Sequence, residues 1–250
     1  MQYFIKNHHH DNESLIKEVE GLKQLSQVLN KYAINELSIP QIIDFNAKKL
    51  TLENIQTQNA TSTQMQQFAL GLAKLHTVKF KQYGLAYNNF IGLNIQKNRL
   101  FDDWGSFFAD YRLAFQIDLI EESTIRTLFK KVLINNRYKL INYLNSSCEH
   151  ASLVHGDLWS GNVLFSKQSI YLIDPAIYYA DREVDIAMSE MFGGFTHDFY
   201  DTYDKSLPLS ENYHDKKIIY NLYHYLNHFN LFGDSYLHEC EEGFSFIEKL

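Results

Sequence analysis

The chain has 250 residues, of which 45% are hydrophobic and 21% are charged, so it can form one large domain or two small lobes around a cleft. The net charge of −7 and the lack of a long Lys/Arg block argue against nucleic-acid binding. The apolar runs are short, the N-terminus lacks the order of a secretory signal, and the two cysteines, Cys148 and Cys240, are far apart. We therefore expect a cytoplasmic protein with no transmembrane helix and no disulfide framework.

The first 60 residues show the pattern strand, helix, strand, strand. Residues 3–6 are typical of a short strand that ends in a lysine, and residues 13–31 carry apolar side chains at helical spacing. Two extended stretches follow at residues 39–43 and 49–55, and the turn-forming residues 46–48 between them favour a hairpin.

From residue 62 onward the apolar pattern becomes mainly helical. The predicted elements are helices at residues 63–77, 103–117 and 123–146, a strand that enters a loop at residues 152–157, a hairpin of two short strands at residues 163–165 and 170–173, and mostly helical structure over residues 183–250.

The segment that carries chemistry is H-G-D-L-W-S-G-N at residues 155–162, followed by I-D-P at residues 173–175. Phosphoryl transfer needs a group that takes the proton of the acceptor hydroxyl and oxygen ligands for Mg²⁺, which prefers carboxylate and amide oxygens. Asp157 and Asn162 have the D-x-x-x-x-N spacing of a kinase catalytic loop, and the hairpin is expected to bring Asp174 beside them. Asp and Asn often only stabilise turns, but the whole arrangement favours a kinase site.

These residues resemble the fructosamine (ketosamine) kinase family, which is related to the aminoglycoside phosphotransferases and has a protein-kinase-like fold. Trp159 distinguishes this family from the broader aminoglycoside and choline kinase group. The resemblance covers nearly all of the chain, and the other matching segments are D-D-W at 102–104, R-L at 112–113, D-L-I-E at 118–121, I-D-P-A-I-Y-Y-A-D-R-E-V-D-I-A at 173–187, M-F-G-G-F at 191–195 and N-L-Y-H-Y-L-N-H-F-N-L-F-G at 221–233.

The resemblance implies an α+β, protein-kinase-like fold with two lobes. Residues 1–58 would form a truncated, β-rich N-terminal lobe, and residues 59–250 a larger helical lobe with the catalytic loop and the acceptor site. Family members carry further strands and a glycine-containing loop before the lysine strand, and that loop normally shields and positions the triphosphate. We expect the natural protein to continue upstream of residue 1, the alternative being a reduced kinase.

The resemblance also implies roles for the residues that hold the reacting groups. Asp157 would be the catalytic base, and Asn162 and Asp174 would bind Mg²⁺. Lys6 would bind the phosphates of ATP, with Glu18 as its ion-pair partner.

Further residues would bind the nucleotide base, contact the acceptor or support the loop. The segment Glu53, Asn54 and Ile55 resembles the hinge that hydrogen-bonds adenine through its backbone. Trp159 would be a platform for a sugar or an amine, the alternative being an ordinary core ring. His155 would be structural, and Asp185 would brace the catalytic loop.

Three functions follow as hypotheses. The favoured one is an ATP- and Mg²⁺-dependent kinase that phosphorylates the sugar 3-hydroxyl of ketosamines, either small molecules or glycated proteins, and so supports deglycation. The alternatives are another small-molecule kinase of the aminoglycoside or choline kinase type, and a non-catalytic module that lacks the phosphate loop. We expect a monomer without a nucleic-acid or membrane partner.

Overall fold

The N-terminal sheet consists of β1 (Tyr3–Asn7), β2 (Ile42–Phe45) and β3 (Lys49–Glu53) in the order β1–β3–β2, with antiparallel neighbours. The structure is a computed structural model that describes residues 3–7 and 13–250. The Asn46 side chain explains the tight turn between β2 and β3, because its Oδ1 accepts the backbone N–H groups of Lys48 and Lys49 at 2.8 and 3.0 Å.

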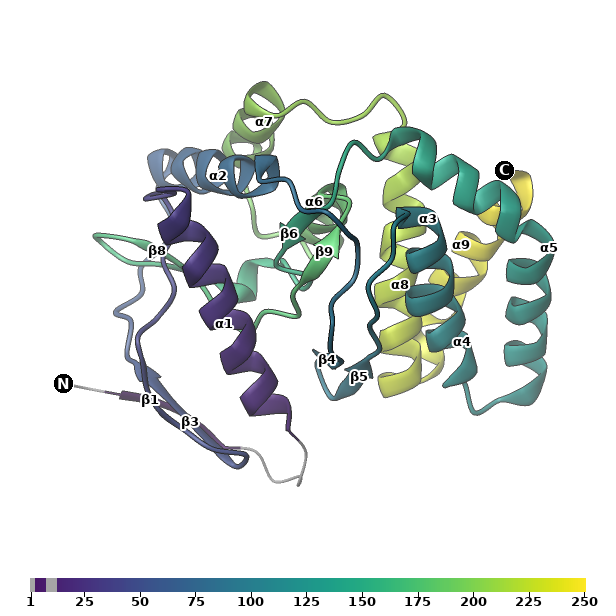
Figure 1. Cartoon of the computed structure of the whole chain (residues 1–250), viewed down its shortest axis with the longest axis horizontal. Coiled ribbons are helices and arrows are strands. Elements are labelled where there is room, and N and C mark those ends of the chain that lie inside the picture. Colours follow the sequence, from purple (N-terminus) through teal and green to yellow (C-terminus); the bar gives the residue numbers. More distant parts are fainter. Residues whose placement is uncertain (1–2, 8–12) are drawn as a thin grey trace.

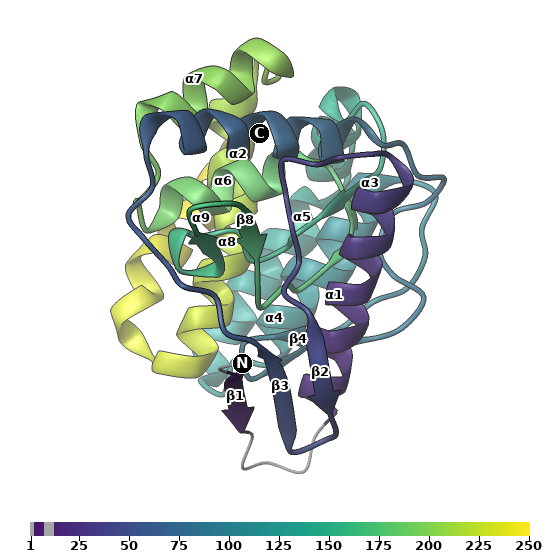
Figure 2. The ribbon, with the colours of Figure 1, turned by 90° about the vertical axis from the view of Figure 1, so that its left-hand side faces the viewer.

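Helix α1 (Ser14–Lys31) joins this sheet to the rest of the molecule (Figure 2). The apolar side chains of its first half, such as Leu15 and Leu22, pack against Leu50 and Leu52 of the central strand β3. The apolar side chains of its second half belong to a different core, which includes α2 and the β7–β8 hairpin. One helix therefore fixes the sheet relative to the region that carries the catalytic loop.

The remaining elements are mostly helical; α3, α4, α5, α8 and α9 lie on the far side of α1 from the sheet, whereas α2 and β8 lie near the opposite end of α1 (Figure 1). In chain order they are α2 (Ser62–Thr77), β4 (Asn89–Ile91), β5 (Asn94–Gln96), α3 (Trp104–Phe107), a π-helix (Phe108–Ala114), α4 (Phe115–Asp118), α5 (Ser123–Ser147), β6 (Ser152–Val154), a 3₁₀ turn (Ser160–Asn162), β7 (Val163–Phe165), β8 (Ile170–Leu172), β9 (Tyr178–Ala180), α6 (Glu183–Met191), α7 (His197–Ser206), α8 (Tyr213–Phe232), a second 3₁₀ turn (Asp234–Tyr236) and α9 (Leu237–Lys249).

Two short antiparallel pairs, β6–β9 and β7–β8, set the geometry of the catalytic region. The chain leaves β6 at residue 154, passes through the loop and the 3₁₀ turn, and returns through β7 and β8 to reach Asp174. Because Val163 pairs with Leu172, the residues just before β7 and just after β8 are neighbours. The hairpin therefore places Asn162 beside residues 173–174, as the sequence predicts.

The observed elements confirm the predicted order strand, helix, strand, strand and the predicted helices, with several differences. The extended stretch predicted at residues 39–43 is β2 at Ile42–Phe45, and β9 was not predicted. The helix predicted at residues 103–117 contains a π-helical segment, and the strand predicted at residues 49–55 ends at Glu53. The β4–β5 hairpin was also not predicted, because strands of three residues are too short to show an alternation of apolar and polar residues. No helix in the part of the chain that the structure describes has the length and apolar character needed to cross a bilayer.

Candidate active site

The buried carboxylate of Asp185 holds the start of the catalytic loop, residues 155–162, in place. Asp185, in the first turn of α6, accepts the backbone N–H groups of His155 at 2.7 Å and Gly156 at 2.9 Å. Gly156 has φ of +79°, and a Cβ at that position would lie 2.1 Å from the carbonyl oxygen of Ala176. Only glycine fits this close approach, so the loop takes one path from β6 to Asp157.

Asp185 has a third partner that the sequence analysis missed. The His76 Nε2 lies 3.3 Å from Asp185, and its Nδ1 lies 2.8 Å from the Tyr203 hydroxyl. Burial alone would raise the pKa of Asp185, but the hydrogen bond and charge of His76 and further donors outweigh it, so the pKa is lowered. The available signal was a histidine on the apolar face of the predicted helix 63–77.

His155 connects the loop to the segment that precedes Asp174. Its Nε2 lies 2.9 Å from the backbone oxygen of Ile173, and its Nδ1 accepts the backbone N–H of Asp157 at 3.3 Å. Burial lowers the pKa of His155, which fits a neutral ring that donates through Nε2. Both ring nitrogens are thus used within the loop, and this supports the predicted structural role of His155.

The three residues predicted to carry the chemistry lie together in one cavity. Asn162 donates from Nδ2 to the backbone oxygen of Asp157 at 2.8 Å and to its Oδ2 at 3.1 Å. Asp174 follows β8 with φ of +50°, a strained conformation for a residue other than glycine, and strain of this kind clusters at functional sites.

Lys6 bridges the N-terminal sheet and this cavity. Its Nζ lies 2.8 Å from the Glu18 Oε2 and 2.9 Å from the Asp174 Oδ1. The cavity, which we call the site cavity, has a volume of about 370 Å³. It is lined by Lys6, Ser14, Leu15, Lys17, Glu18, Asn89, Phe90, Gly92, Leu93, Asp157, Trp159, Asn162, Asp174, Pro175 and Ala176.

The carboxylates of the site cavity differ in their protonation. Burial raises the pKa of Asp157 to about 7; the Asn162 hydrogen bond opposes this shift, and the charges of Asp174 and Asp185 add to it. Burial and the charge of Asp174 likewise raise the pKa of Glu18 to about 7. Burial also disfavours ionised Asp174, but Lys6 and the hydrogen bonds outweigh it and lower the pKa of Asp174. The site therefore combines one carboxylate with a lowered pKa, Asp174, with two carboxylates, Asp157 and Glu18, whose pKa lies near neutral pH.

Trp159 lies in the wall of the site cavity and is 38% exposed, which rules out an ordinary core ring. The indole packs over Gly161, where a Cβ would come within 2.2 Å of the ring. The edge of the Phe192 ring meets it at a centroid distance of 6.2 Å. Glycine at position 161 thus makes room for the ring, and one face of the site is aromatic.

The predicted adenine hinge does not line the site cavity. Among the described residues, Glu53, Asn54 and Ile55 are not part of the site-cavity lining. The Glu53 Oε1 instead accepts the backbone N–H of Gln41 at 2.9 Å. A hinge would bind adenine through its backbone, which the side-chain contact of Glu53 does not address. The hinge role of Glu53, Asn54 and Ile55 therefore stays a prediction.

The sequence analysis also missed the wall formed by β4 and β5. Asn89 and Phe90 of β4 and Leu93 of the hairpin turn line the site cavity. Asn89 is held in place, since its Nδ2 donates to the backbone oxygen of Ile177 at 2.9 Å and its Oδ1 accepts from Gln96 at 2.9 Å. No short motif marks this hairpin in the sequence.

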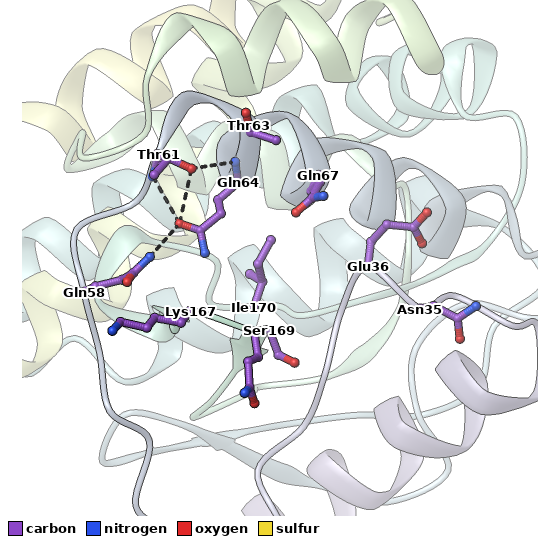
Figure 3. A pocket seen from close by; sticks show the side chains of 11 residues that line it. Asn35, Glu36, Gln58, Thr61, Thr63, Gln64, Gln67, Lys167, Ser169 and Ile170 are labelled. Carbon is purple, nitrogen blue, oxygen red and sulfur yellow. Dashed lines mark hydrogen bonds between the residues drawn. The ribbon is translucent and has the colours of Figure 1, made fainter.

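A second cavity of about 450 Å³ lies between the start of α2 and the β7–β8 turn (Figure 3). Two of its polar side chains cap α2: the Thr61 Oγ1 accepts the Gln64 backbone N–H at 3.2 Å, and the Gln64 Oε1 accepts the Thr61 backbone N–H at 3.2 Å. These are the contacts of a helix cap. The smaller site cavity is therefore the candidate active site.

Comparisons with known proteins agree with this geometry. The sequence profile of the fructosamine kinase family matches residues 1–249. A protein of Vibrio parahaemolyticus named a probable ketoamine kinase is 41% identical over 175 residues, which are 70% of this chain and 60% of that protein. Another probable ketoamine kinase, from Enterococcus faecium, is 35% identical over 240 residues, which are 94% of this chain and 83% of that protein.

Solved structures show the same fold. A protein from Haemophilus somnus assigned as a fructosamine-3-kinase superposes with a TM-score of 0.82 at 25% identity, covering 98% of this chain and 82% of its own. The choline kinase LicA of Streptococcus pneumoniae superposes with a TM-score of 0.65 at 18% identity, covering 99% and 86%, and supports the fold alone. The predicted α+β, protein-kinase-like fold is confirmed, and the chain belongs to the fructosamine kinase family, a family of phosphotransferases that act on an alcohol group.

Proposed function

We propose that this chain is an ATP- and Mg²⁺-dependent kinase that phosphorylates the sugar 3-hydroxyl of ketosamines, the sugar adducts of amines. One observation carries the proposal: Lys6, Asp157, Asn162 and Asp174 all line a single cavity beside an exposed tryptophan. Family membership supports the acceptor class, and the kinase-like fold supports ATP as the donor.

The donor set fits a magnesium ion. Asp174 supplies a carboxylate whose pKa is lowered, so it is ionised at neutral pH. Asn162 uses its Nδ2 to bind Asp157, so the amide oxygen is the atom that remains for a cation. Mg²⁺ commonly takes one or two protein ligands and completes its shell with phosphate oxygens and water. When bound, it would neutralise charge on the β- and γ-phosphates.

Asp157 is the group that receives the proton of the acceptor hydroxyl. Its Oδ2 is held at 3.1 Å by Asn162, and its pKa of about 7 suits a base that works near neutral pH. Lys6 Nζ lies 2.9 Å from the Asp174 Oδ1 and can bind phosphate oxygens as a point charge. In this proposal the phosphates bind beside Lys6 and the acceptor binds beside Trp159, both of which line the site cavity.

The proposed cellular role is deglycation in the cytoplasm. Phosphorylation at the 3-hydroxyl would destabilise the sugar–amine adduct, which would then break down and release the amine. The candidate acceptors are free ketosamines and glycated lysines of proteins, and the sugar can be fructosyl or ribulosyl.

The test is phosphate transfer from Mg·ATP to ribulosyl-lysine and fructosyl-lysine, followed by ³¹P NMR of the product. Transfer to the 3-hydroxyl of at least one adduct supports the proposal, and unmodified lysine serves as the control acceptor. Transfer to choline or an aminoglycoside with none to either adduct would place the chain with the other small-molecule kinases instead.

A further inference from the structure

A line of aromatic rings leads from the site cavity to the end of α8. It consists of Trp159, Phe192, His228, Phe232 and Tyr236, which we call the aromatic strip. Neighbouring ring centroids are 6.2 Å apart between Trp159 and Phe192, 5.5 Å between Phe192 and His228, 5.7 Å between His228 and Phe232, and 5.0 Å between His228 and Tyr236.

Three rings of the strip, Trp159, Phe192 and Phe232, are exposed to solvent, and His228 and Tyr236 are partly buried. Phe192 is 47% exposed and Phe232 is 63% exposed, whereas core rings nearby, such as Tyr223 and Phe229, are buried. A contiguous exposed aromatic surface commonly marks a binding site. The exposure of these rings is not that of a loose chain end, because all five residues lie in or next to a helix or a 3₁₀ turn.

The strip is anchored to the wall of the site cavity. Asn94 of β5 donates from Nδ2 to the Asn227 Oδ1 of α8 at 2.8 Å. The hairpin turn at Gly92, which lines the cavity, lies next to Leu231. Trp159 belongs to both the cavity lining and the strip. The rings therefore form a continuation of the site rather than a separate patch.

The shape of a ketosamine indicates what would lie on these rings. With its hydroxyl at Asp157 and its sugar against Trp159, an acceptor that extends past this ring would place its amine end on Phe192 and the rest of the strip. That amine is a secondary amine and carries a positive charge at neutral pH. Aromatic faces bind both cations and the methylene groups of a lysine side chain. Burial lowers the pKa of His228, so its neutral ring adds no repelling charge.

We infer that the aromatic strip binds the amine carrier of the acceptor, and that this carrier is a lysine side chain within a peptide. The inference rests on the proposed function for the position of the sugar. It makes Phe192 and Phe232 specificity-determining residues that favour peptide-bound adducts over adducts of small amines.

The experiment compares two acceptors that carry the same sugar. One is ribulosyl-lysine within a short peptide, and the other is the ribulosyl adduct of ethylamine. In Phe192→Ala and Phe232→Ala, KM for the peptide should rise roughly three- to tenfold, with kcat nearly unchanged. For Phe232→Ala, whose ring meets His228 and Tyr236, KM for the ethylamine adduct should stay within about twofold. Tyr138→Ala, at a ring that is 79% exposed on α5, is the matched control.

Equal changes for the two acceptors, or no change for the peptide, would overturn the inference. Calorimetric binding of the glycated peptide to the native chain and the variants gives a second readout that needs no turnover. If the native chain transfers phosphate to neither adduct, the proposed function fails. Weaker peptide binding by the two variants would then still support the strip, while equal or absent binding would refute it.

Discussion

Replacing Asp185 by asparagine tests how the catalytic loop is held. The carboxylate accepts two backbone N–H bonds at 2.7 and 2.9 Å and faces His76 at 3.3 Å, in a fully buried position. Asparagine keeps one oxygen but turns an NH₂ group toward one of these donors, so at least one buried N–H loses its partner. With hydrogen bonds to charged groups contributing about 1.5–3 kcal/mol, we expect a loss of about 2–4 kcal/mol.

A loss of this size would leave a folded protein, because domains are commonly stable by about 5–15 kcal/mol. Urea unfolding followed by circular dichroism measures the difference in the free energy of unfolding. The lowered pKa of Asp185 makes its contribution complete above its ordinary value of 3.8, and the contribution is lost as the pH falls through the lower folded value. The difference in the free energy of unfolding between the native chain and Asp185→Asn should therefore become smaller in strong acid.

The control is Asp118→Asn, which removes an exposed ion pair with Lys130. Exposed pairs contribute about 0–1 kcal/mol, so this variant should be near native. If Asp185→Asn were no less stable than Asp118→Asn at neutral pH, the account of Asp185 as the anchor of the loop would be refuted.

Three further predictions concern the site cavity. The value of kcat/KM for the acceptor should rise with pH through an apparent pKa near 7, because burial raises the pKa of Asp157 and only the ionised form accepts a proton; a flat pH–rate profile would contradict this. Asp174→Ala should abolish the Mg²⁺ dependence of nucleotide binding measured by calorimetry, and unchanged dependence would remove Asp174 from the metal site. Gly161→Ala should displace the Trp159 ring, since the new Cβ would lie 2.2 Å from it; KM for the acceptor should rise while KM for ATP stays constant, and a parallel rise of both would argue against an acceptor role for the ring.

The parts of the site that the sequence predicts are those whose partners lie close in the chain. Asp157 and Asn162 are five residues apart and hydrogen-bonded, and the hairpin that follows them brings Asp174 to the same cavity. The pairing of Lys6 with Glu18 came from the family resemblance, and the two side chains lie 2.8 Å apart in the structure.

The missed parts depend on contacts across long stretches of chain. His76 reaches Asp185 from 109 positions away, and nothing local distinguishes it from a buried histidine. The hairpin that contributes Asn89 has strands too short to show alternation. The exposure of Phe192 and Phe232 was equally hidden, because exposure is decided by tertiary packing and helical spacing alone favours a core position.

The most direct test of the central claim is the rate of phosphate transfer by Asp157→Asn with Mg·ATP and the better ketosamine acceptor. We predict that kcat falls at least about 100-fold, while nucleotide binding by calorimetry stays close to that of the native chain. A variant that transfers phosphate at a near-native rate would show that Asp157 is not the base, and the assignment of the site cavity as the active site would lose its main support.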